Sequence, residues 1–487
     1  MSELQKDPYA LIQMQFLFIG SILVLMMVPG LGYLYTGLTR ATNTRKMIAS
    51  SILVSTVGSL QWYFWGYSLS FSTTSNNKFI GDLHNIVYYN MFSGFTNSIE
   101  SNIQNYTELP FSIFQGLFMI VTIAILSGCV NERTNYLPFS IFIFCWCTVV
   151  YCPCAYWIWN SNGWAYQWGV LDYAGGFIEI TSGLCGFIYP IFVFQKKRKH
   201  EIMISKRASI SNVTMGMMFL CIGWLGFNTC TTVDPSDRSF VAFMNTILSG
   251  LTCFITWSAL EIFTQGECTY VGVCSGIICG LVAATPSSGM IQFWASLIQG
   301  VVTAVCCFHA AKFKFLVGID DSMDILAEHF VAGVIGLLFN GLFANDWIMA
   351  LDGVTDHPGG WVNQHYIQLA KQIAYIAAVT GYAGVVTVVL LFAIDKIPGC
   401  QLFTDYYMNE NDMDDEENQL NDSDIDSDLI RNDSSDKIID SVELSNLDNS
   451  NSSSMPDILV MKSRQDQQEL ERIKSNYTMH PHQTFTQ

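Results

Sequence analysis

Long uncharged apolar runs recur along most of the chain and limit its possible folds more than any other feature. A helix that crosses a bilayer needs about 20 mainly apolar residues, because its backbone must be hydrogen-bonded without water. Eleven such runs predict spans over 15–37, 47–71, 110–130, 137–158, 174–195, 208–230, 239–263, 269–285, 289–309, 325–344 and 373–394. Charged residues make up only 13% of the sequence, against about 25% in an ordinary soluble domain. We therefore expect an all-α integral membrane protein with eleven transmembrane helices.

The net charge of −18 is unevenly distributed. Residues 401–487 hold 20 Asp and Glu against 6 Lys and Arg, a net charge of −14, which leaves −4 for the first 400 residues. An acidic segment with few aromatic residues buries too little apolar surface to fold by itself. The sequence predicts an extracellular N-terminus over 1–14, a transmembrane domain over 15–400 and a disordered cytosolic tail over 401–487. The acidity also argues against a nucleic-acid partner, which would require a basic face.

Basic residues in the short loops predict the orientation, because Lys and Arg accumulate on the cytosolic side of a membrane. One set of alternate loops carries thirteen of them and the opposite set carries four. This bias places the N-terminus outside and the C-terminus inside, consistent with an odd number of spans. The sequon that begins at Asn105 then lies outside, where Asn105 is a candidate for glycosylation. The expected location is the plasma membrane or an endomembrane such as the endosome or vacuole.

Neither the cysteines nor the known catalytic motifs predict an enzyme. Most of the fifteen Cys lie inside apolar runs, as Cys145 and Cys152 do, and are interpreted as small buried hydrophobic residues. An intramembrane hydrolase could use a Glu and His pair, but the chain lacks His-Glu-x-x-His and Gly-x-Ser-x-Gly motifs. We therefore expect no enzyme activity, no cofactor and no bound metal.

Ionisable side chains in the predicted spans are candidates for function, because they are costly in lipid. Asp172 and Glu179 begin the fifth span, and His329 lies in the tenth. Glu179 is followed by Gly183 and Gly186, and glycines follow His329 at the same two spacings. These spacings place each polar residue and its glycines on one helical face, where two backbones can approach closely. The alternative for each residue is a packed polar side chain without a further role.

The two glycine-containing segments occupy the fifth place in successive sets of five spans. Because five is odd, a duplicated five-span unit enters the membrane in opposite senses, which is the inverted repeat of many transporters. We therefore expect an inverted five-helix repeat plus an eleventh helix, with Glu179 and His329 facing each other at its centre.

Seven motifs occur in order across these spans. They are Pro29-Gly30 with Tyr35-Thr36-Gly37, Trp65-Gly66-Tyr67-Ser68, Phe114-Gln115-Gly116-Leu117-Phe118, Asn131-Glu132-Arg133, Leu171-Asp172-Tyr173-Ala174-Gly175-Gly176, Trp224-Leu225-Gly226-Phe227-Asn228, and Asp320-Asp321-Ser322-Met323-Asp324. In these motifs the chain resembles the ammonium transporter family of Amt, Mep and Rhesus proteins, over about residues 15–400. The resemblance implies a homotrimer with one pore per subunit that conducts ammonium or ammonia. An ammonium sensor with little net flux would keep the same residues and is the alternative.

Carried over residue by residue, the resemblance implies three groups of pore residues. They are an outer recruitment site of Phe114, Trp159 and Thr231 supported by Asp172, an aromatic gate of Phe118 and Phe227, and a central pair of Glu179 and His329. The chemistry of ammonium fits these groups, because an aromatic face beside a hydroxyl offers a cation–π attraction of about 1–2 kcal/mol and a hydrogen bond. Two stacked phenylalanines form a constriction that hydrated ions cross with difficulty. The alternative for the three phenylalanines is ordinary packing.

The sequence departs from the family pattern at three places. The first central residue is Glu179, whereas the family most often has His at this position. Glu is found there in one branch of Mep-type transporters. The stretch from Gly176 to Glu179 is one residue shorter than usual, so an ungapped alignment would place Ile180 at this position; the Glu-Ile-Thr-Ser-Gly match favours Glu179. Residues 401–417 resemble the family's C-terminal docking sequence poorly.

Overall fold

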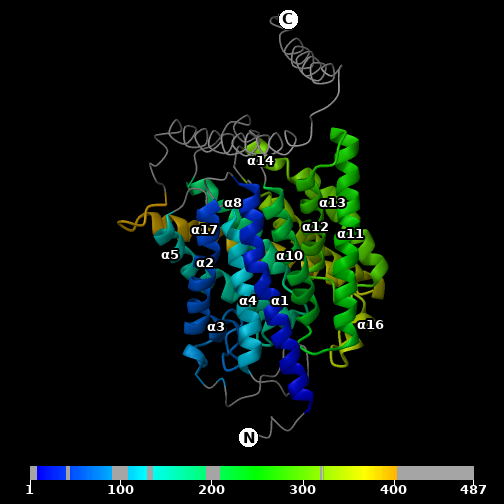
Figure 1. Cartoon of the computed structure of the whole chain (residues 1–487). Coiled ribbons are helices and arrows are strands. Elements are labelled where there is room, and N and C mark those ends of the chain that lie inside the picture. The colour runs from blue at the N-terminus through cyan, green and yellow to red at the C-terminus, as the bar shows by residue number, and fades with distance from the viewer. Residues whose placement is uncertain are drawn as a thin grey trace, which may run out of the picture. The chain divides into compact units, whose positions relative to one another are not determined.

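The computed structural model describes residues 8–39, 44–89, 91, 108–128, 135–193, 209–317, 321 and 323–402. Among these residues the regular structure is helical (Figure 1), apart from one isolated bridge between Ile291 and Ala344. The predicted all-α architecture is confirmed. The glycosylation candidate Asn105, the Asn131-Glu132-Arg133 motif and the tail beyond residue 402 lie outside the described residues.

Each of the eleven predicted apolar runs forms helix. In chain order they are α1 (Pro8–Leu38), α2 (Thr44–Gln61) continued by η3 (Trp62–Gly66) and α3 (Tyr67–Phe71), α4 (Glu108–Ser127), α5 (Tyr136–Trp146) continued by η5 (Cys147–Tyr151) and α6 (Cys152–Trp159), α8 (Gly176–Val193), α10 (Ile210–Cys230), α11 (Asp237–Gln265), α12 (Tyr270–Ala284), α13 (Phe293–Ala310), η6 (Leu326–Val331) continued by α15 (Ala332–Phe343), and α17 (Ile367–Asp395). Shorter helices are η4 (Ile86–Tyr88), α7 (Trp164–Trp168), α14 (Phe313–Val317), α16 (Asp346–Met349), η7 (Ala350–Asp352) and η8 (Trp361–Asn363). Within the described residues, eight helical segments are long and apolar enough to cross a membrane, and α8 and α12 are shorter apolar helices.

Helix α4 lies in the interior of the bundle. Every side chain from Phe114 to Ser127 is buried, and the helix contacts α1, α2 and α8. A helix that is apolar on all sides can be surrounded by other helices, because no face needs water. Helix α4 is therefore covered by other parts of the protein along this stretch.

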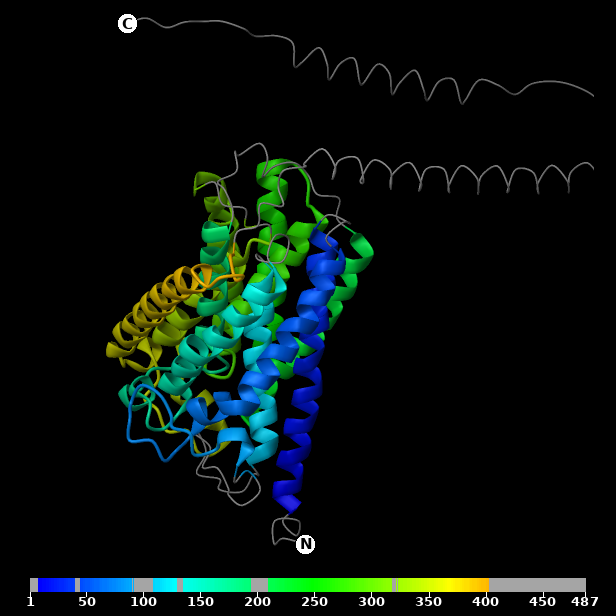
Figure 2. The ribbon, with the colours of Figure 1, turned by 90° about the vertical axis from the view of Figure 1, so that its left-hand side faces the viewer.

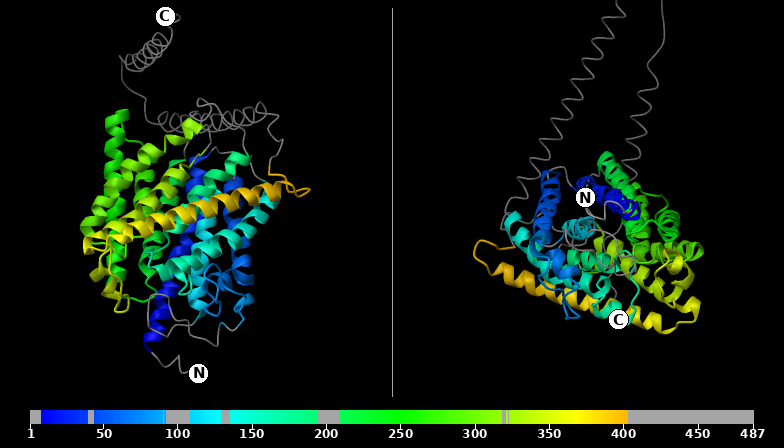
Figure 3. Two further views of the ribbon diagram at one scale, coloured as in Figure 1. Left: turned by 180° about the vertical axis from the view of Figure 1, so that it is seen from behind. Right: turned by 90° about the horizontal axis from the view of Figure 1, so that it is seen from below.

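Helix α17 covers one side of the bundle and is inclined to α1 (Figures 2 and 3). One stripe at helical spacing is buried against α5, α8 and α15, and it consists of Gln368, Gln372, Tyr375, Val379, Ala383, Thr387, Leu391 and Ile394. Apolar side chains outside the stripe, such as Val385 and Phe392, are exposed. A single buried stripe with apolar residues on the other faces is typical of a helix that meets lipid.

The irregular segment before α8 is held by side-chain amides. Asn340 donates hydrogen bonds to the carbonyls of Leu171 (3.0 Å) and Pro286 (2.6 Å). Gln372 donates to the Leu171 carbonyl (2.6 Å) and accepts from the Leu171 backbone N–H (2.9 Å). Non-helical backbone at membrane depth is tolerated where protein groups replace water as its partners. These contacts therefore fix the turn from which α8 begins.

Arg238, at the start of α11, is fully buried and paired. Its Nη1 lies 2.6 Å from Asp352 Oδ2 and donates to Thr355 Oγ1 (3.0 Å), and its Nε donates to the Gly289 carbonyl (2.8 Å). A buried charge is tolerated when an opposite charge and hydrogen bonds face it. Arg238 thus joins α11 to two segments that are distant in sequence.

Candidate functional site

Glu179 of α8 and His329 of η6 lie against each other inside the protein. Glu179 Oε2 is 2.8 Å from His329 Nδ1, and the two residues are 1% and 3% exposed. The structure therefore brings together two candidates that are 150 positions apart in sequence, and Glu179 rather than Ile180 makes the contact.

Glycines allow the two helices to approach at this point. A Cβ added to Gly333 would lie 2.7 Å from the Cβ of Glu179, and one added to Gly183 would lie 2.3 Å from the backbone N of Phe330. Both distances are shorter than real side chains permit. The glycine four residues after each central residue is thus the position where the opposite helix packs.

Each of the two helices that carry the central pair begins at a buried aspartate. Asp172 accepts hydrogen bonds from the backbone N–H groups of Gly175 (3.0 Å) and Phe177 (3.1 Å). Asp321 accepts from Ile325 (3.0 Å) and Leu326 (3.1 Å) in the same way. A carboxylate at this position satisfies free N–H groups and interacts favourably with the helix dipole. In both halves of the chain, an aspartate side chain therefore caps the N-terminus of the helix that carries the central residue.

The spacing from aspartate to central residue differs between the two halves, and a π-helix accommodates the difference. Glu179 follows Asp172 by seven residues, whereas His329 follows Asp321 by eight. Residues Leu326–Val331 form the π-helix η6, whose wider turn contains one more residue than an α-turn. The extra residue is absorbed in η6, and His329 still meets Glu179.

The predicted gate and recruitment aromatics form one contacting group. The rings of Phe118 and Phe227 are stacked, with centroids 3.8 Å apart at 24°. Phe118 also packs edge-on against Phe114 at 4.8 Å and against Trp159 at 5.9 Å. All four residues are at most 8% exposed. The residues predicted as gate and as outer aromatic faces therefore pack together inside the protein.

Thr231 and Asp172 complete the predicted recruitment site in different ways. Thr231 lies one turn beyond Phe227, and its hydroxyl donates to the Phe227 carbonyl (2.8 Å), which leaves the oxygen as an acceptor. Asp172 acts through the turn it caps, because a Cβ on Gly175 would lie 3.1 Å from Trp159 Cζ2. Asp172 thus positions the backbone behind Trp159.

One face of α10 connects the recruitment site to the central pair. Thr231, Phe227 and Trp224 follow one another at spacings of four and three residues, which places them on one helical face. The Trp224 ring stacks on His329 at 6.4 Å and 21°, and its Nε1 donates to Thr285 Oγ1 (2.9 Å). Ring contacts therefore form a continuous column from Phe118 and Phe227 through Trp224 to His329.

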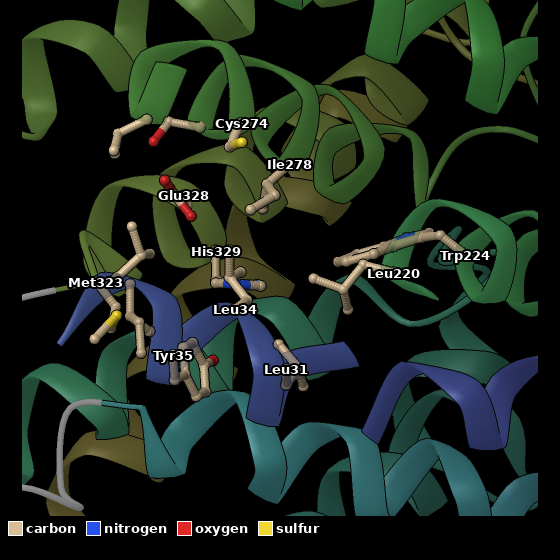
Figure 4. A pocket seen from close by; sticks show the side chains of 14 residues that line it. Leu31, Leu34, Tyr35, Leu220, Trp224, Cys274, Ile278, Met323, Glu328 and His329 are labelled. Atoms are coloured by element: carbon tan, nitrogen blue, oxygen red, sulfur yellow. The ribbon is translucent and has the colours of Figure 1, made fainter. Parts of the chain in front are cut away.

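Sequence reasoning overlooked two residues of this site. Trp224 belonged to a motif but was given no role, and its contact with His329 depends on tertiary structure. Glu328, beside His329, is 7% exposed and lines a cavity with it (Figure 4). The criterion that singled out Glu179, an ionisable side chain within a span, applies equally to Glu328.

The site offers hydrogen-bond acceptors and aromatic faces in apolar surroundings. Within the described ranges, no group of three or more His, Cys, Asp or Glu is placed to hold a metal ion. Such a passage can bind a small hydrogen-bond donor and exchange protons with it, because a carboxylate and an imidazole meet at its centre.

Comparison with known proteins gives the same assignment as the motifs. The model of the family described as "Ammonium Transporter Family" matches residues 15–422. The chain belongs to the ammonium transporter family. The resemblance seen in the seven motifs is therefore confirmed, and the chain is a membrane protein of this family.

Relatives within the ammonium transporter family are similar over most of their length. The chain is 48% identical over 402 residues to ammonium transporter MEP3 of Saccharomyces cerevisiae, covering 82% of this chain and 81% of the relative. It is 47% identical over 405 residues to MEP1 of the same yeast, with the same coverages. The crystal structure of Saccharomyces cerevisiae Mep2 superposes with a TM-score of 0.77 at 35% identity, covering 82% of this chain and 90% of that one.

Proposed function

We propose that this chain transports ammonium or ammonia across a membrane along the column that leads to Glu179 and His329 and past this pair. The observation that carries the proposal is the 2.8 Å contact of this buried pair beneath a closed stack of aromatic rings. The family and the transporter names of its relatives support the same substrate. The alternative, a sensor with little flux, is not favoured, because these similar relatives are named as transporters.

Transport begins with capture of the cation at the outer site. Trp159 and Phe114 offer aromatic faces, and the Thr231 oxygen accepts a hydrogen bond, so that together they replace part of the hydration shell of ammonium. The selected cation is one that donates hydrogen bonds, which distinguishes ammonium from a metal ion of the same charge.

Passage then depends on the gate and the central pair. The stacked rings of Phe118 and Phe227 exclude a hydrated ion. Beyond them, Glu179 and His329 accept hydrogen bonds or protons from the permeating nitrogen. We propose that accepting a proton from the permeating nitrogen lowers its charge, which favours its passage through an apolar pore.

The proposed architecture has eleven spans, the N-terminus outside and the acidic tail inside. The two aspartate-capped helices that meet at Glu179 and His329 support an inverted five-helix repeat with α17 as the eleventh span. We further propose a homotrimer with one pore per subunit, located in the plasma membrane or in an endosomal or vacuolar membrane. We also propose that Asn105, on the outer side, is glycosylated.

Transport into proteoliposomes tests the function. We expect the wild-type chain to move radiolabelled methylammonium, a substrate analogue, down its gradient. His329→Ala should abolish this flux, because a hydrogen-bond acceptor is lost where nothing replaces it, at a cost of about 1–3 kcal/mol for the permeant. His309→Ala is the matched control, because His309 is an exposed histidine of α13. A wild-type protein without flux would contradict the proposed transport function.

A further inference from the structure

Beyond His329 the passage opens into a small cavity that the recruitment site, gate and central pair do not include. Its lining comes from the C-terminal part of α1, from α10, from α12 and from η6 with the residues before it, and most of the side chains are apolar. The polar exceptions are Tyr35, Ser275, Glu328 and His329. About 20 Å³ is open to the centre of a water-sized molecule, whereas one water needs about 10–15 Å³. The cavity therefore has room for one small hydrogen-bonding molecule.

The cavity and the aromatic gate lie on opposite sides of the central pair. Phe114 packs at the level of Gly20 on α1, since a Cβ added to Gly20 would be 3.0 Å from the Phe114 ring. The cavity is lined by Leu31 to Leu38 of the same helix, which lie about 16–27 Å further along its axis at 1.5 Å per residue. In the proposed orientation this is the cytosolic end of the pore.

Glu328 is the carboxylate of this cavity. Its side chain points into the space bordered by Cys274, Ile278 and His329 (Figure 4). Ser275 of α12 lines the same cavity and places a hydroxyl group beside the apolar side chains. Placing a carboxylate in a mostly apolar cavity is unfavourable unless donors or a cation face it. The position therefore favours a ligand that is cationic and donates hydrogen bonds.

Lys314 and His329, which lie near Glu328, are bound to other carboxylates. Lys314 acts electrostatically on Glu328, but its Nζ lies 2.7 Å from Asp324 Oδ1 and donates to the Asp321 carbonyl (3.2 Å). The ring of His329 is hydrogen-bonded through Nδ1 to Glu179. Glu328 and Ser275 thus contribute a carboxylate and a hydroxyl to one cavity, a pair that suits a small cation with N–H donors.

We propose that Glu328 and Ser275 form a second substrate-binding site, for a small hydrogen-bond-donating cation such as ammonium or methylammonium, at the inner end of the pore. This inference rests on the proposed transport function. The carboxylate supplies the charge and one acceptor, and the serine oxygen supplies another. The site binds substrate that enters from, or leaves toward, the cytosolic end, whereas the recruitment site at Trp159 serves the outer end.

The test compares substrate affinity at the two ends of the pore. Uptake of methylammonium into intact cells measures the half-saturation concentration for the outer end, and uptake into inside-out membrane vesicles measures it for the cytosolic end. Glu328→Gln keeps the shape but removes the charge, so the cytosolic half-saturation concentration should rise about tenfold, the ratio expected when a charge-assisted hydrogen bond becomes a neutral one. The outer value should stay within about twofold. Ser275→Ala should raise the cytosolic value about threefold.

Controls separate this inference from a general defect and from failure of the proposed function. Glu267→Gln removes an exposed carboxylate between α11 and α12 and should change neither value. An unchanged cytosolic value in Glu328→Gln, or an equal rise at both ends, would overturn the second site. If Glu328→Gln does not reach the membrane, an unchanged cytosolic value in Ser275→Ala overturns it instead. Absence of saturable uptake by the wild type would instead contradict the proposed transport function.

Discussion

At the scale of single residues, the central pair combines an acid with a base. The Glu179 carboxylate is hydrogen-bonded to His329 Nδ1 at 2.8 Å, and one face of the imidazole stacks on Trp224. A histidine at position 179 would supply a group that titrates near pH 6.5, whereas a glutamate has an ordinary pKa near 4.3. The identity of this residue should therefore be visible in the pH dependence of transport.

Replacing Glu179 tests this role in proton handling. Glu179→Gln keeps the size and the hydrogen bond to His329 but cannot gain or lose a proton, so we expect flux to continue with a flatter dependence on external pH. Glu179→His restores the commoner family arrangement and should shift the optimum, because a second imidazole then titrates in the pore. The measurement is the initial rate of methylammonium uptake between about pH 5 and pH 8. Superimposable curves for the three proteins would show that Glu179 takes no part in proton handling.

Outside the spans, His357 is held in its neutral form. Its Nδ1 accepts a hydrogen bond from the Gly359 N–H (3.2 Å), so its Nε2 carries the proton and donates to the Gly169 carbonyl (3.3 Å). Burial, followed by the nearby charges of Lys371 and His365, lowers the pKa of His357 to about 4. Protonation of Nδ1 would break the bond to Gly359 and place a charge in a partly buried site.

Stability should consequently depend on acid pH. The unfolded chain takes up a proton at His357 near pH 6.5 and the folded chain only near pH 4, so stability falls as the pH drops between these values, by on the order of 3 kcal/mol. Thermal unfolding in detergent, followed from about pH 7 to pH 4, measures the loss. His357→Gln cannot titrate and should show a shallower decline. An equally steep decline in this variant would assign the acid sensitivity to other groups.

Much of the site could be predicted because its signals are local. The matching glycine spacings after Glu179 and His329 predicted that these residues face each other, and the structure places them in contact. The partnership of Trp224 with His329 and Thr285 could not be predicted, since it depends on how α10 is rotated against η6 and α12. Glu328 was missed although it satisfies the same rule as Glu179.

At the scale of elements, the crossing of α8 with η6 and α15 determines how Glu179 meets His329 in the proposed pore. Gly183 lies where the backbone of Phe330 approaches, and Gly333 lies against Glu179. Helix association in lipid relies on such close packing, because apolar side chains gain little by leaving the lipid. The crossing therefore tolerates no added side chain at these two positions.

Gly183→Ala should separate the two helices and destabilise the protein by about 1–3 kcal/mol, the usual cost of overpacking. The melting temperature in detergent should fall, and transport should weaken as Glu179 and His329 move apart. The control is Gly381→Ala in α17, where an added Cβ meets nothing within 4 Å. That substitution should be neutral or should stabilise the helix by up to about 1 kcal/mol. Equal melting temperatures for Gly183→Ala and the wild type would contradict the close crossing.

Hydropathy predicted where the chain forms apolar helix, but the ends of these helices and the irregular segments depend on other forces. Helix α1 begins at Pro8 and α17 at Ile367, both earlier than their apolar runs suggest. The turn around Leu171 is stable because Asn340 and Gln372 satisfy its backbone, and these partners are remote in sequence. The π-helix η6 could not be predicted either, because its pattern of apolar residues does not differ from that of an α-helix.

At the scale of the whole molecule, the proposed pore is built within a single chain. The residues of the gate and central pair, Phe118, Phe227, Glu179 and His329, all come from one subunit and are at most 3% exposed. Apolar side chains such as Phe240 and Ile255 of α11, by contrast, are exposed in the single chain. A homotrimer would thus join complete pores rather than create one between subunits.

Independent pores predict how mixed trimers behave. When wild-type subunits are co-expressed with inactive His329→Ala subunits, flux per trimer should fall in proportion to the inactive fraction, because each chain supplies every residue of its own column. Trimers are purified with separate tags on the two chains, and methylammonium uptake is measured in proteoliposomes for each composition. A trimer with one active subunit should keep about one third of the wild-type flux, as non-interacting sites require. A loss that follows the second or third power of the active fraction would show that neighbouring subunits must be active together. Because the Glu179–His329 contact is internal to one chain, the linear dependence is the expected result.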